Sequence, residues 1–135
     1  MSLFGALPIA TSGIDEAQTW ISATAGNIAN ANDAGPTSQS AYETQYVQAT
    51  AVPSGDPGGA GQGVSSSIVL GSGAGQESYD PTNPLADAQG MVRYPAVDLG
   101  EQMTNLVMAQ TSYQANVAVV NQAKTAYQSA LTLGS

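Results

Sequence analysis

Rows of mostly hydrophobic side chains recur every seven residues at both ends of this 135-residue chain, and they constrain the fold more than any other feature. The repeat is clearest over residues 98–133, in two rows: Met103, Gln110, Val117, Lys124 and Leu131, and Leu99, Leu106, Tyr113, Val120 and Tyr127. Such rows are typical of helices that pack along one another in coiled coils. They predict a C-terminal helix of roughly 50 Å at 1.5 Å per residue. Asp98 and Glu101 are suited to cap its start, and Gly134 can end it.

A second repeat lies near the N-terminus. Large residues form one row and mostly small residues the other: Leu7, Ile14, Ile21 and Ile28, then Leu3, Ala10, Ala17, Thr24 and Ala31. The residues allow two starts for this helix. Pro8 could occupy the first helical position, where its missing N–H costs nothing, or Ser12 and Asp15 could form a capping box. Glycine and asparagine accumulate further on, so we expect the helix to end near Asn32.

The middle of the chain holds most of the glycines and six of the seven prolines. Alternating side chains over residues 42–52 and 64–70 predict two strands, separated by a turn-rich stretch. A second break follows at residues 71–75. We therefore expect one β-hairpin or a small sheet of two to three strands. Residues 79–95 are punctuated by prolines and are expected to be extended chain.

Together these patterns predict a mainly α fold with a small β and irregular insert. The N-terminal helix (1–32) and the C-terminal helix (97–135) form one inner-core domain, an antiparallel-type coiled coil or helical hairpin, and the central segment (33–96) contributes a short β-hairpin. Past Glu101 the C-terminal helix carries a single charge, Lys124, whereas a helix with one wet face normally carries several. We therefore expect other subunits to cover it.

Composition limits the chemistry that the chain can perform. Charged residues make up 9% of the chain, against about 25% in an ordinary soluble domain. The net charge is −8, and Arg93 and Lys124 are the only cations, which argues against nucleic acid and anionic membranes as partners. The chain has no His and no Cys. Disulfides, thiolate nucleophiles, imidazole–zinc sites and a Ser-His-Asp triad are therefore excluded.

The remaining candidates for chemistry do not fit a site. Asp80, Asp87 and Asp98 lack the spacing of a calcium loop. The glycine-rich segment 71–75 lacks the Lys-Ser/Thr ending of a phosphate-binding loop. Lys124 lies on a seven-residue row, where a polar residue typically sets register. The sequence thus predicts no enzyme, no catalytic residue, no metal, no cofactor and no small-molecule substrate.

The first 13 residues carry no Lys or Arg and no sustained apolar run. This pattern predicts that no signal peptide is cleaved. No apolar run approaches the roughly 18–20 residues of a membrane-spanning helix.

Several short motifs, in their order and spacing, resemble the flagellar rod, hook and hook-associated proteins. Ser12-Gly13-Ile14 and the segment from Gly26 to Asn32 are similar to the N-terminal signature of this family. Later segments resemble its proximal rod subunits in particular. The motif positions that carry the resemblance include Asn27, Asn30, Asn83, Pro84, Asp87 and Asn116, together with the run Val92–Met103 and the closing Thr132-Leu133-Gly134.

The resemblance implies a structural subunit of the proximal rod of the bacterial flagellar basal body. It implies export through the flagellar type III apparatus without cleavage, and assembly in the periplasm. The implied partners are copies of the chain, other proximal rod proteins, the basal adaptor and distal rod subunits. The terminal helices would build a hollow drive shaft that transmits torque and leaves the export channel open, with the middle segment facing outward.

Within this interpretation we expect the large members of the rows to pack the subunits together: Ile14, Ile21 and Ile28, against Leu106, Tyr113, Val117, Val120 and Tyr127, with Met103 and Leu131. Asn27 and Asn30 share a helix face, and they could either bond a neighbouring subunit or end the helix. Two alternatives stay open: another member of the same axial group, and a small helical-hairpin secretion substrate that binds as a heterodimer. Because seams without partners leave apolar stripes exposed, we expect the isolated chain to be only marginally helical.

Overall fold

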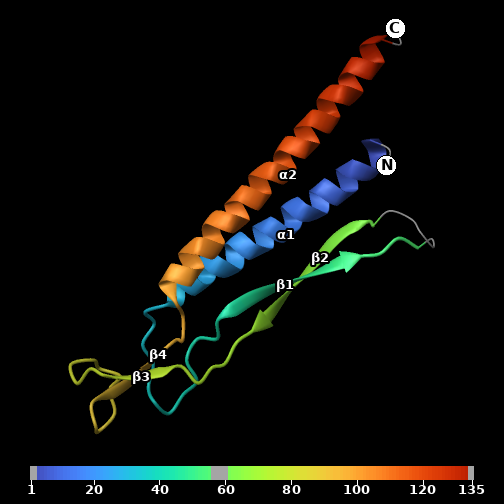
Figure 1. The fold of residues 1–135 in the computed structure, drawn as a ribbon. Coiled ribbons are helices and arrows are strands. Elements are labelled where there is room, and N and C mark those ends of the chain that lie inside the picture. The colour runs from blue at the N-terminus through green and yellow to red at the C-terminus, as the bar shows by residue number, and fades with distance from the viewer. Residues whose placement is uncertain (1–2, 56–60, 134–135) are drawn as a thin grey trace.

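A computed structural model describes residues 3–55 and 61–133 of the chain. Within these ranges two helices enclose a β insert (Figure 1). In chain order the elements are α1 (Leu3–Asn30), β1 (Gln45–Val52), β2 (Gly63–Leu70), β3 (Gln76–Tyr79), β4 (Met91–Tyr94) and α2 (Leu99–Leu133). The predicted class, mainly helical with a small β insert, is confirmed.

The start of α1 differs from both predictions. The helix begins at Leu3, so Pro8 lies inside it and Ser12 is not a cap. A proline in a helix interior removes one backbone hydrogen bond to the carbonyl four residues earlier, here that of Phe4, and the helix continues through it. The helix ends at Asn30, close to the predicted end, and the N–H of Asp33 then bonds the Asn30 carbonyl at 3.1 Å.

The start of α2 follows the prediction. The Asp98 carboxylate accepts a hydrogen bond from the Glu101 N–H at 3.0 Å, and the Asp98 carbonyl accepts one from Gln102 at 2.9 Å. Asp98 is therefore the N-cap, and Glu101 lies in the first turn, near the positive end of the helix dipole. The predicted end at Gly134 lies outside the described residues.

The two helices pack antiparallel to one another (Figure 1). Ala6 lies beside Ala123, and Gly13 lies against Asn116. A step of seven residues toward the C-terminus along α1 therefore corresponds to a step of seven residues toward the N-terminus along α2. The hydrogen bond from Asn27 to Gln102 fits the same register. By this register the end of α1 is level with the start of α2. Because α2 has 35 residues and α1 has 28, the C-terminal part of α2 extends past α1 at the other end (Figure 1).

The predicted hairpin is formed by β1 and β2, which pair antiparallel from Gln45↔Leu70 to Val52↔Gly63. It runs along α1 on the side away from α2 (Figure 1). The Ser12 hydroxyl accepts a hydrogen bond from the Val64 N–H at 3.0 Å. Ser12 therefore joins α1 to the hairpin and does not cap the helix. The helix α1 is consequently the middle layer of the molecule.

The expectation of extended chain over residues 79–95 is wrong, because β3 and β4 form a second hairpin in this region. They pair antiparallel from Gln76↔Tyr94 to Tyr79↔Met91. Glu77 and Arg93 form an ion pair across it at 2.8 Å. The strands are four residues long and β3 is exposed throughout, so no alternation of apolar and polar residues marks them. The predicted break at residues 71–75 does separate the two hairpins.

The buried core consists mainly of alanines. Among the described residues the buried hydrophobic side chains are Ala10, Ala17, Ala23, Ala31, Val92, Ala109 and Ala123. Small side chains let two helix backbones approach closely, whereas the larger aliphatic and aromatic residues lie at the margins of the contact and on the surface. In the described part of the chain, neither helix combines the length and apolar character needed to cross a membrane.

Candidate subunit-packing surface

One predicted row of α2 flanks the contact with α1. Its members Leu106, Tyr113 and Val120 are half-buried. Leu99 and Tyr127, the first and last members, are exposed. The row therefore borders the packed seam along most of its length and leaves apolar area uncovered at both ends.

The other predicted row of α2 is mostly exposed in the single chain. Met103 and Leu131 expose 59% and 57% of their area, Gln110 and Lys124 are also exposed, and Val117 is half-buried. This row is not the one that α1 covers. Its role in contacts between subunits stays a prediction.

The row of α2 that α1 covers is a third one, which the sequence analysis missed. Gln102, Ala109 and Ala123 are buried, and Asn116 between them is half-buried. These residues also recur every seven positions, but alanine and amide side chains do not stand out in a search for hydrophobic rows. Of the small N-terminal row, Ala10, Ala17 and Thr24 of α1 are buried, and so is Ala31 directly after the helix. A search for matched small rows would have found the seam.

The large row of α1 lies beside the buried small row. Ile14, Ile21 and Ile28 are half-buried. Each therefore keeps part of its apolar side chain accessible while it borders the contact with α2. Their pairing with particular residues of α2 or of a neighbouring subunit stays a prediction.

Asn27 joins three elements inside the chain. Its amide N–H groups donate to the Gln45 carbonyl at 2.8 Å and to Gln102 Oε1 at 2.9 Å. Its oxygen accepts from the Gln45 N–H at 2.8 Å and from the Tyr42 hydroxyl at 3.1 Å. The side chain is 1% exposed. These four bonds fill the capacity of the amide and hold α1, β1 and α2 together, which leaves Asn27 no group for a neighbouring subunit.

Asn30 and Asn116 bond within their own helices. The Asn30 amide donates to the Gly26 carbonyl at 2.8 Å, and the Asn116 amide donates to the Ser112 carbonyl at 3.0 Å. The Asn116 side chain also packs against Gly13, where an added methyl group would come within 2.8 Å of its amide atoms. Gly13 and Asn116, two motif residues, thus form one close contact between the helices.

The motif residues Asn83, Pro84 and Asp87 lie in the loop between β3 and β4. Asn83 Oδ1 accepts from the Leu85 N–H at 3.0 Å. The Asp87 carboxylate accepts from the N–H groups of Met91 and Gln89 at 2.9 Å each, and from the Thr37 hydroxyl at 2.9 Å.

These hydrogen bonds lower the pKa of Asp87. The bond from the Met91 N–H contributes most, followed by that from the Thr37 hydroxyl, and desolvation acts in the opposite direction. Asp87 therefore fixes the turn of the second hairpin and ties it to the segment after α1. It performs a structural role at the far end of the molecule from the projecting part of α2 (Figure 1).

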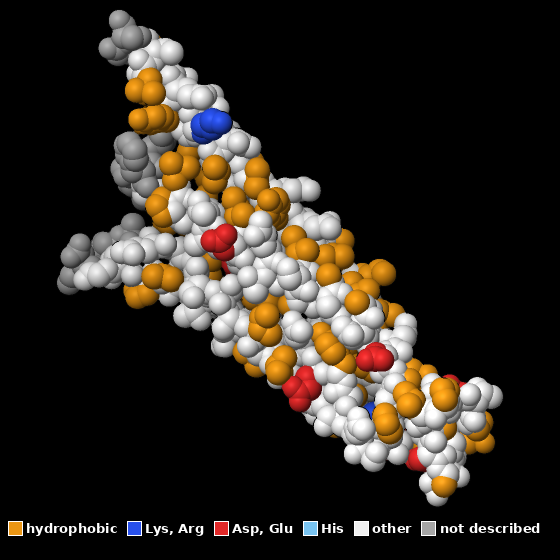
Figure 2. Space-filling view, turned by 180° about the vertical axis from the view of Figure 1, so that it is seen from behind, with side chains coloured by type: hydrophobic (Ala, Val, Ile, Leu, Met, Phe, Trp, Pro, Cys, Tyr) orange, Lys and Arg blue, Asp and Glu red, His pale blue; other side chains and the backbone are white. Residues whose placement is uncertain are grey.

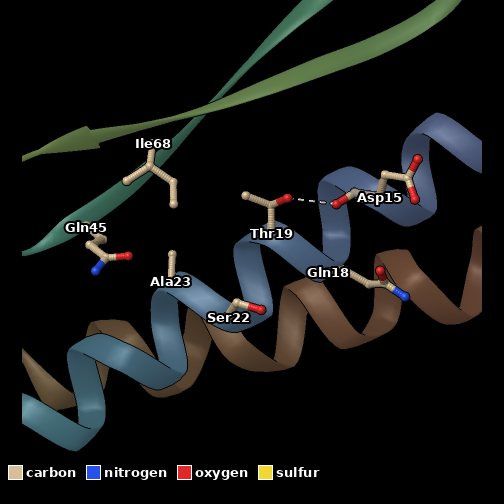
Figure 3. A pocket seen from close by; sticks show the side chains of 7 residues that line it. All are labelled: Asp15, Gln18, Thr19, Ser22, Ala23, Gln45 and Ile68. Carbon is tan, nitrogen blue, oxygen red and sulfur yellow. Dashed lines mark hydrogen bonds between the residues drawn. The ribbon is translucent and has the colours of Figure 1, made fainter.

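A hollow between α1 and the β1–β2 hairpin carries no constellation for catalysis in its lining (Figure 3). It measures about 470 Å³. Ile68 points into it from β2, across from Thr19 and Ala23 of α1. Its one charged side chain is Asp15, so it holds no pair for acid–base work. Among the described residues no three His, Cys, Asp or Glu side chains gather as metal ligands.

The accessible surface instead offers apolar side chains with few charges. Figure 2 shows hydrophobic side chains in patches along the length of the molecule, with only isolated charged ones between them. On α2 the exposed large hydrophobic residues run from one end to the other: Leu99, Met103, Val107, Met108, Val119, Tyr127, Leu131 and Leu133. Exposed apolar area of this extent marks a surface for association with other proteins. The geometry therefore favours a role in association with other proteins over a role in catalysis.

Comparison with known proteins shows which class of protein carries a helix of this kind. A family model described as flagellar basal body rod FlgEFG protein C-terminal matches residues 88–133, which span β4 and all of α2. The match thus covers the exposed helix α2 and begins just after the motif residues Asn83, Pro84 and Asp87.

Full-length relatives narrow the class. The flagellar basal-body rod proteins FlgC of Escherichia coli O6:H1 and of Salmonella typhimurium are each 39% identical to the chain, over 99% of both chains. FlgC of Borreliella burgdorferi is 29% identical over 98% of both chains. The chain belongs to the FlgC family of flagellar basal-body rod proteins. It is a structural subunit of the rod and not an enzyme.

Proposed function

We propose that the chain forms part of the proximal rod, a hollow drive shaft in which α1 and α2 pack with neighbouring subunits as coiled coils. The shaft transmits torque and leaves the export channel open along its axis. The partners are copies of the chain, other proximal rod proteins, the basal adaptor and distal rod subunits. The subunit reaches the periplasm through the flagellar type III export apparatus without cleavage.

The observation that carries this proposal is the uncovered apolar surface of α2. Burial of a side chain the size of Leu or Val stabilises by about 1.5–3 kcal/mol. Met103, Leu131 and the other exposed members of the rows together offer enough apolar area to hold several helices against α2. Beyond Glu101 and Lys124 this helix has no charged residue to oppose burial.

Torque transmission requires helices that do not slide past one another. Interdigitated side chains at seven-residue spacing provide that resistance, because each knob would have to leave its hole for the helices to shift. We assign the knobs to Ile14, Ile21 and Ile28, which border the α1–α2 seam and remain partly accessible.

The first experiment is electron microscopy of basal bodies from a strain that lacks the gene. We expect inner-membrane rings without a rod, and complete rods when a plasmid supplies the chain. Complete rods and hooks in the deletion strain would refute the proposal.

A point substitution tests the seam. Ile21→Asp places a carboxylate at a half-buried position, where an unpaired charge is costly. We expect cells with this variant to accumulate the protein but to build no rod and not to swim. Gln18→Asp is the matched control, because Gln18 lies on the same helix and is exposed. Normal swimming with Ile21→Asp would show that the row of Ile14, Ile21 and Ile28 does not take part in the subunit contacts.

A further inference from the structure

The β1–β2 hairpin has two outer edges, one on each strand. In an antiparallel pair every second residue bonds the partner strand, and the residues between point their N–H and C=O groups outward. The Gly71 N–H bonds the Thr44 carbonyl at 2.8 Å, so the next pair, Gln45↔Leu70, is of the outward kind. The outward groups therefore belong to Gln45, Val47, Ala49 and Ala51 on β1 and to Val64, Ser66, Ile68 and Leu70 on β2.

The helix α1 covers opposite ends of these two edges. At one end the Asn27 amide bonds both the N–H and the carbonyl of Gln45, at 2.8 Å each. At the other end the Ser12 hydroxyl accepts the Val64 N–H at 3.0 Å. Both bonds agree with the outward direction of the Gln45 and Val64 groups. The helix thus crosses the hairpin from the β2 edge to the β1 edge.

Three outward residues on each strand remain, and we call each set a free half-edge. The half-edge of β1 is Val47, Ala49 and Ala51, and that of β2 is Ser66, Ile68 and Leu70. The hydrogen bonds among the described residues leave the outward backbone groups of both half-edges without a partner. Neither strand carries a charged residue or a proline, which are the residues that usually protect an exposed edge from pairing with another strand.

The two half-edges complement each other. When β2 of one copy lies antiparallel beside β1 of the next, the facing pairs are Leu70–Val47, Ile68–Ala49 and Ser66–Ala51. Each pair then exchanges two hydrogen bonds, and every outward group of both half-edges is satisfied. A shift of two residues in one direction would set Leu70 against Gln45, whose groups Asn27 already holds. A shift in the other direction would set Ser66 against Pro53, which has no N–H.

A hollow receives the side chain at the end of this ladder. It measures about 210 Å³ and is lined by residues 45–47 of β1, by Trp20 and Thr24 of α1, and by residues of α2. Its strand lining belongs to β1, so the hollow lies beside the β1 edge. An apolar cavity of about 150 Å³ already holds a benzene molecule, so this hollow has room for a leucine side chain.

Leu70 is the residue that reaches this hollow in the paired copies. Its side chain lies on the same face of the strand as that of Ile68, which points toward α1 (Figure 3). In the single chain Leu70 exposes 56% of its area. Opposite Val47 of the next copy, Leu70 packs over Trp20 of that copy. The edge bonds and the hollow thus favour the same register.

The dimensions of the sheet suit a second copy of the chain. A copy added at the edge is displaced by two strand spacings, about 9.6 Å. Packed helices lie roughly 8–10 Å apart, so α1 of the added copy fits beside the first α1 under one continuous sheet. A copy that uses its β1 half-edge keeps its β2 half-edge free for the next copy. Such a head-to-tail contact can repeat along a helical assembly.

We propose that copies of the chain join by strand pairing. The β2 half-edge of one copy binds the β1 half-edge of the next, and Leu70 is seated against Trp20. This inference deepens the proposed function and rests on it, because it names a contact between like subunits within the rod.

Paired cysteines test this contact, because the chain has no cysteine of its own. Two versions of the full chain, Ala49→Cys and Ile68→Cys, are expressed together in a strain without the chromosomal gene. Facing residues of a bonded pair lie about 5.5 Å apart at Cα, within the range of a disulfide. We expect a covalent dimer in isolated basal bodies after mild oxidation, and monomer alone when either version is expressed by itself.

Ala51→Cys expressed with Ile68→Cys is the matched control for the register. Position 51 lies two residues further along the same edge, so the two Cα atoms would be about 7–8 Å apart, too far for a disulfide without backbone movement. Its dimer yield should be several-fold lower. Equal yields from positions 49 and 51 would overturn the register and the edge contact with it.

A second pair of variants tests the hollow. Leu70→Ser in both cysteine versions should lower the dimer yield several-fold. Val69→Ser is the matched control, since Val69 exposes 47% of its area but lies on the opposite face of β2. Equal yields in these two backgrounds would overturn the seating of Leu70 against Trp20.

Electron microscopy of the same strains separates this inference from the proposed function. Rods that contain both cysteine versions but give no dimer would overturn the strand pairing alone and leave the edges to a strand of a different subunit. Rods that form without any copy of the chain would reject the proposed function itself.

Discussion

At the scale of single residues, the motif positions act mainly inside the chain. Asn27 joins α1, β1 and α2 through four hydrogen bonds, and Asp87 fixes the second hairpin. A buried amide with all of its bonds made is costly to replace, because its partners lose their bonds without regaining water. Family motifs in this chain thus mark the places where the fold is held together.

We predict that Asn27→Leu removes most of the helical structure of the isolated chain. The substitution leaves the Gln45 N–H, the Tyr42 hydroxyl and the Gln102 amide without their partner, at a cost of about 2–4 kcal/mol. Circular dichroism at 222 nm measures the loss. Asn30→Leu is the matched control, since the Asn30 side chain bonds the Gly26 carbonyl of its own helix. Equal ellipticity in the two variants would contradict the assigned role of Asn27.

Asp87 gives a prediction on pH. Its pKa is lowered in the folded state by the hydrogen bonds from Met91 and Thr37, so its contribution to stability is complete above the ordinary carboxyl pKa of about 4. The contribution is lost as the pH falls through the lower folded-state pKa. Carbon NMR of the carboxyl group should show titration below that of a model peptide. Thr37→Val should raise the pKa of Asp87. Thr82→Val is the control, because the Thr82 hydroxyl bonds Asp80; the same shift in both variants would contradict the assignment.

At the scale of elements, the contact between α1 and α2 depends on small residues. Gly13 lets the Asn116 side chain pack directly against the backbone of α1, and alanines fill most of the buried seam. The close approach of the two helices explains why larger residues such as Ile21 and Leu106 border the seam instead of filling it.

We predict that Gly13→Ala destabilises the helix pair while Gly26→Ala does not. The added methyl group at position 13 would lie 2.8 Å from the Asn116 amide, and relief requires that side chain to leave its bond to Ser112. Overpacking of this kind costs about 1–3 kcal/mol. At position 26 the nearest atom is the Tyr42 hydroxyl at 3.5 Å, so the gain in helix propensity, about 1 kcal/mol, should prevail.

Thermal unfolding followed by circular dichroism compares these two variants. The midpoint should fall for Gly13→Ala and rise or stay constant for Gly26→Ala. Asn116→Ala added to Gly13→Ala should recover part of the loss, because it removes the clashing amide. A double variant less stable than Gly13→Ala alone would contradict the proposed clash.

The sequence predicted those elements whose pattern extends over many residues. Both helices, the Asp98 cap and the β1–β2 hairpin follow from seven-residue rows, a capping residue and alternation. The β3–β4 hairpin was missed because its short strands have no such alternation, and hydrogen bonds of Asn83 and Asp87 fix its loop instead. The row through Ala109 was missed because alanine contributes little to a hydrophobic pattern, although it suits close packing. The Ser12 cap failed because the helix had already begun at Leu3.

At the scale of the whole molecule, the chain is layered around α1 and buries little large apolar area. The helix α1 lies between α2 and the β1–β2 hairpin (Figure 1). Large hydrophobic residues remain exposed on α2 and on β2, among them Met103 and Ile68. Such a subunit gains much of its stability from neighbours, since association removes those surfaces from water.

We predict that the dilute isolated chain unfolds over a broad temperature range, with weak cooperativity. A core made mostly of alanines gives little hydrophobic stabilisation per residue, and isolated helices without a packed face are marginal in water. Circular dichroism across a concentration series measures this: helicity should rise as the chain associates.

Hydrogen exchange should show which regions of the single chain are protected most and least. Amides near the end of α2, at residues 127–133, should exchange fastest, because every side chain there is exposed. Those near Asn27 and Val92 should exchange slowest, because these side chains are almost fully buried. A sharp, concentration-independent melt with uniform protection along α2 would show that the single chain holds its own fold, and the exposed face of α2 would then not be needed for stability.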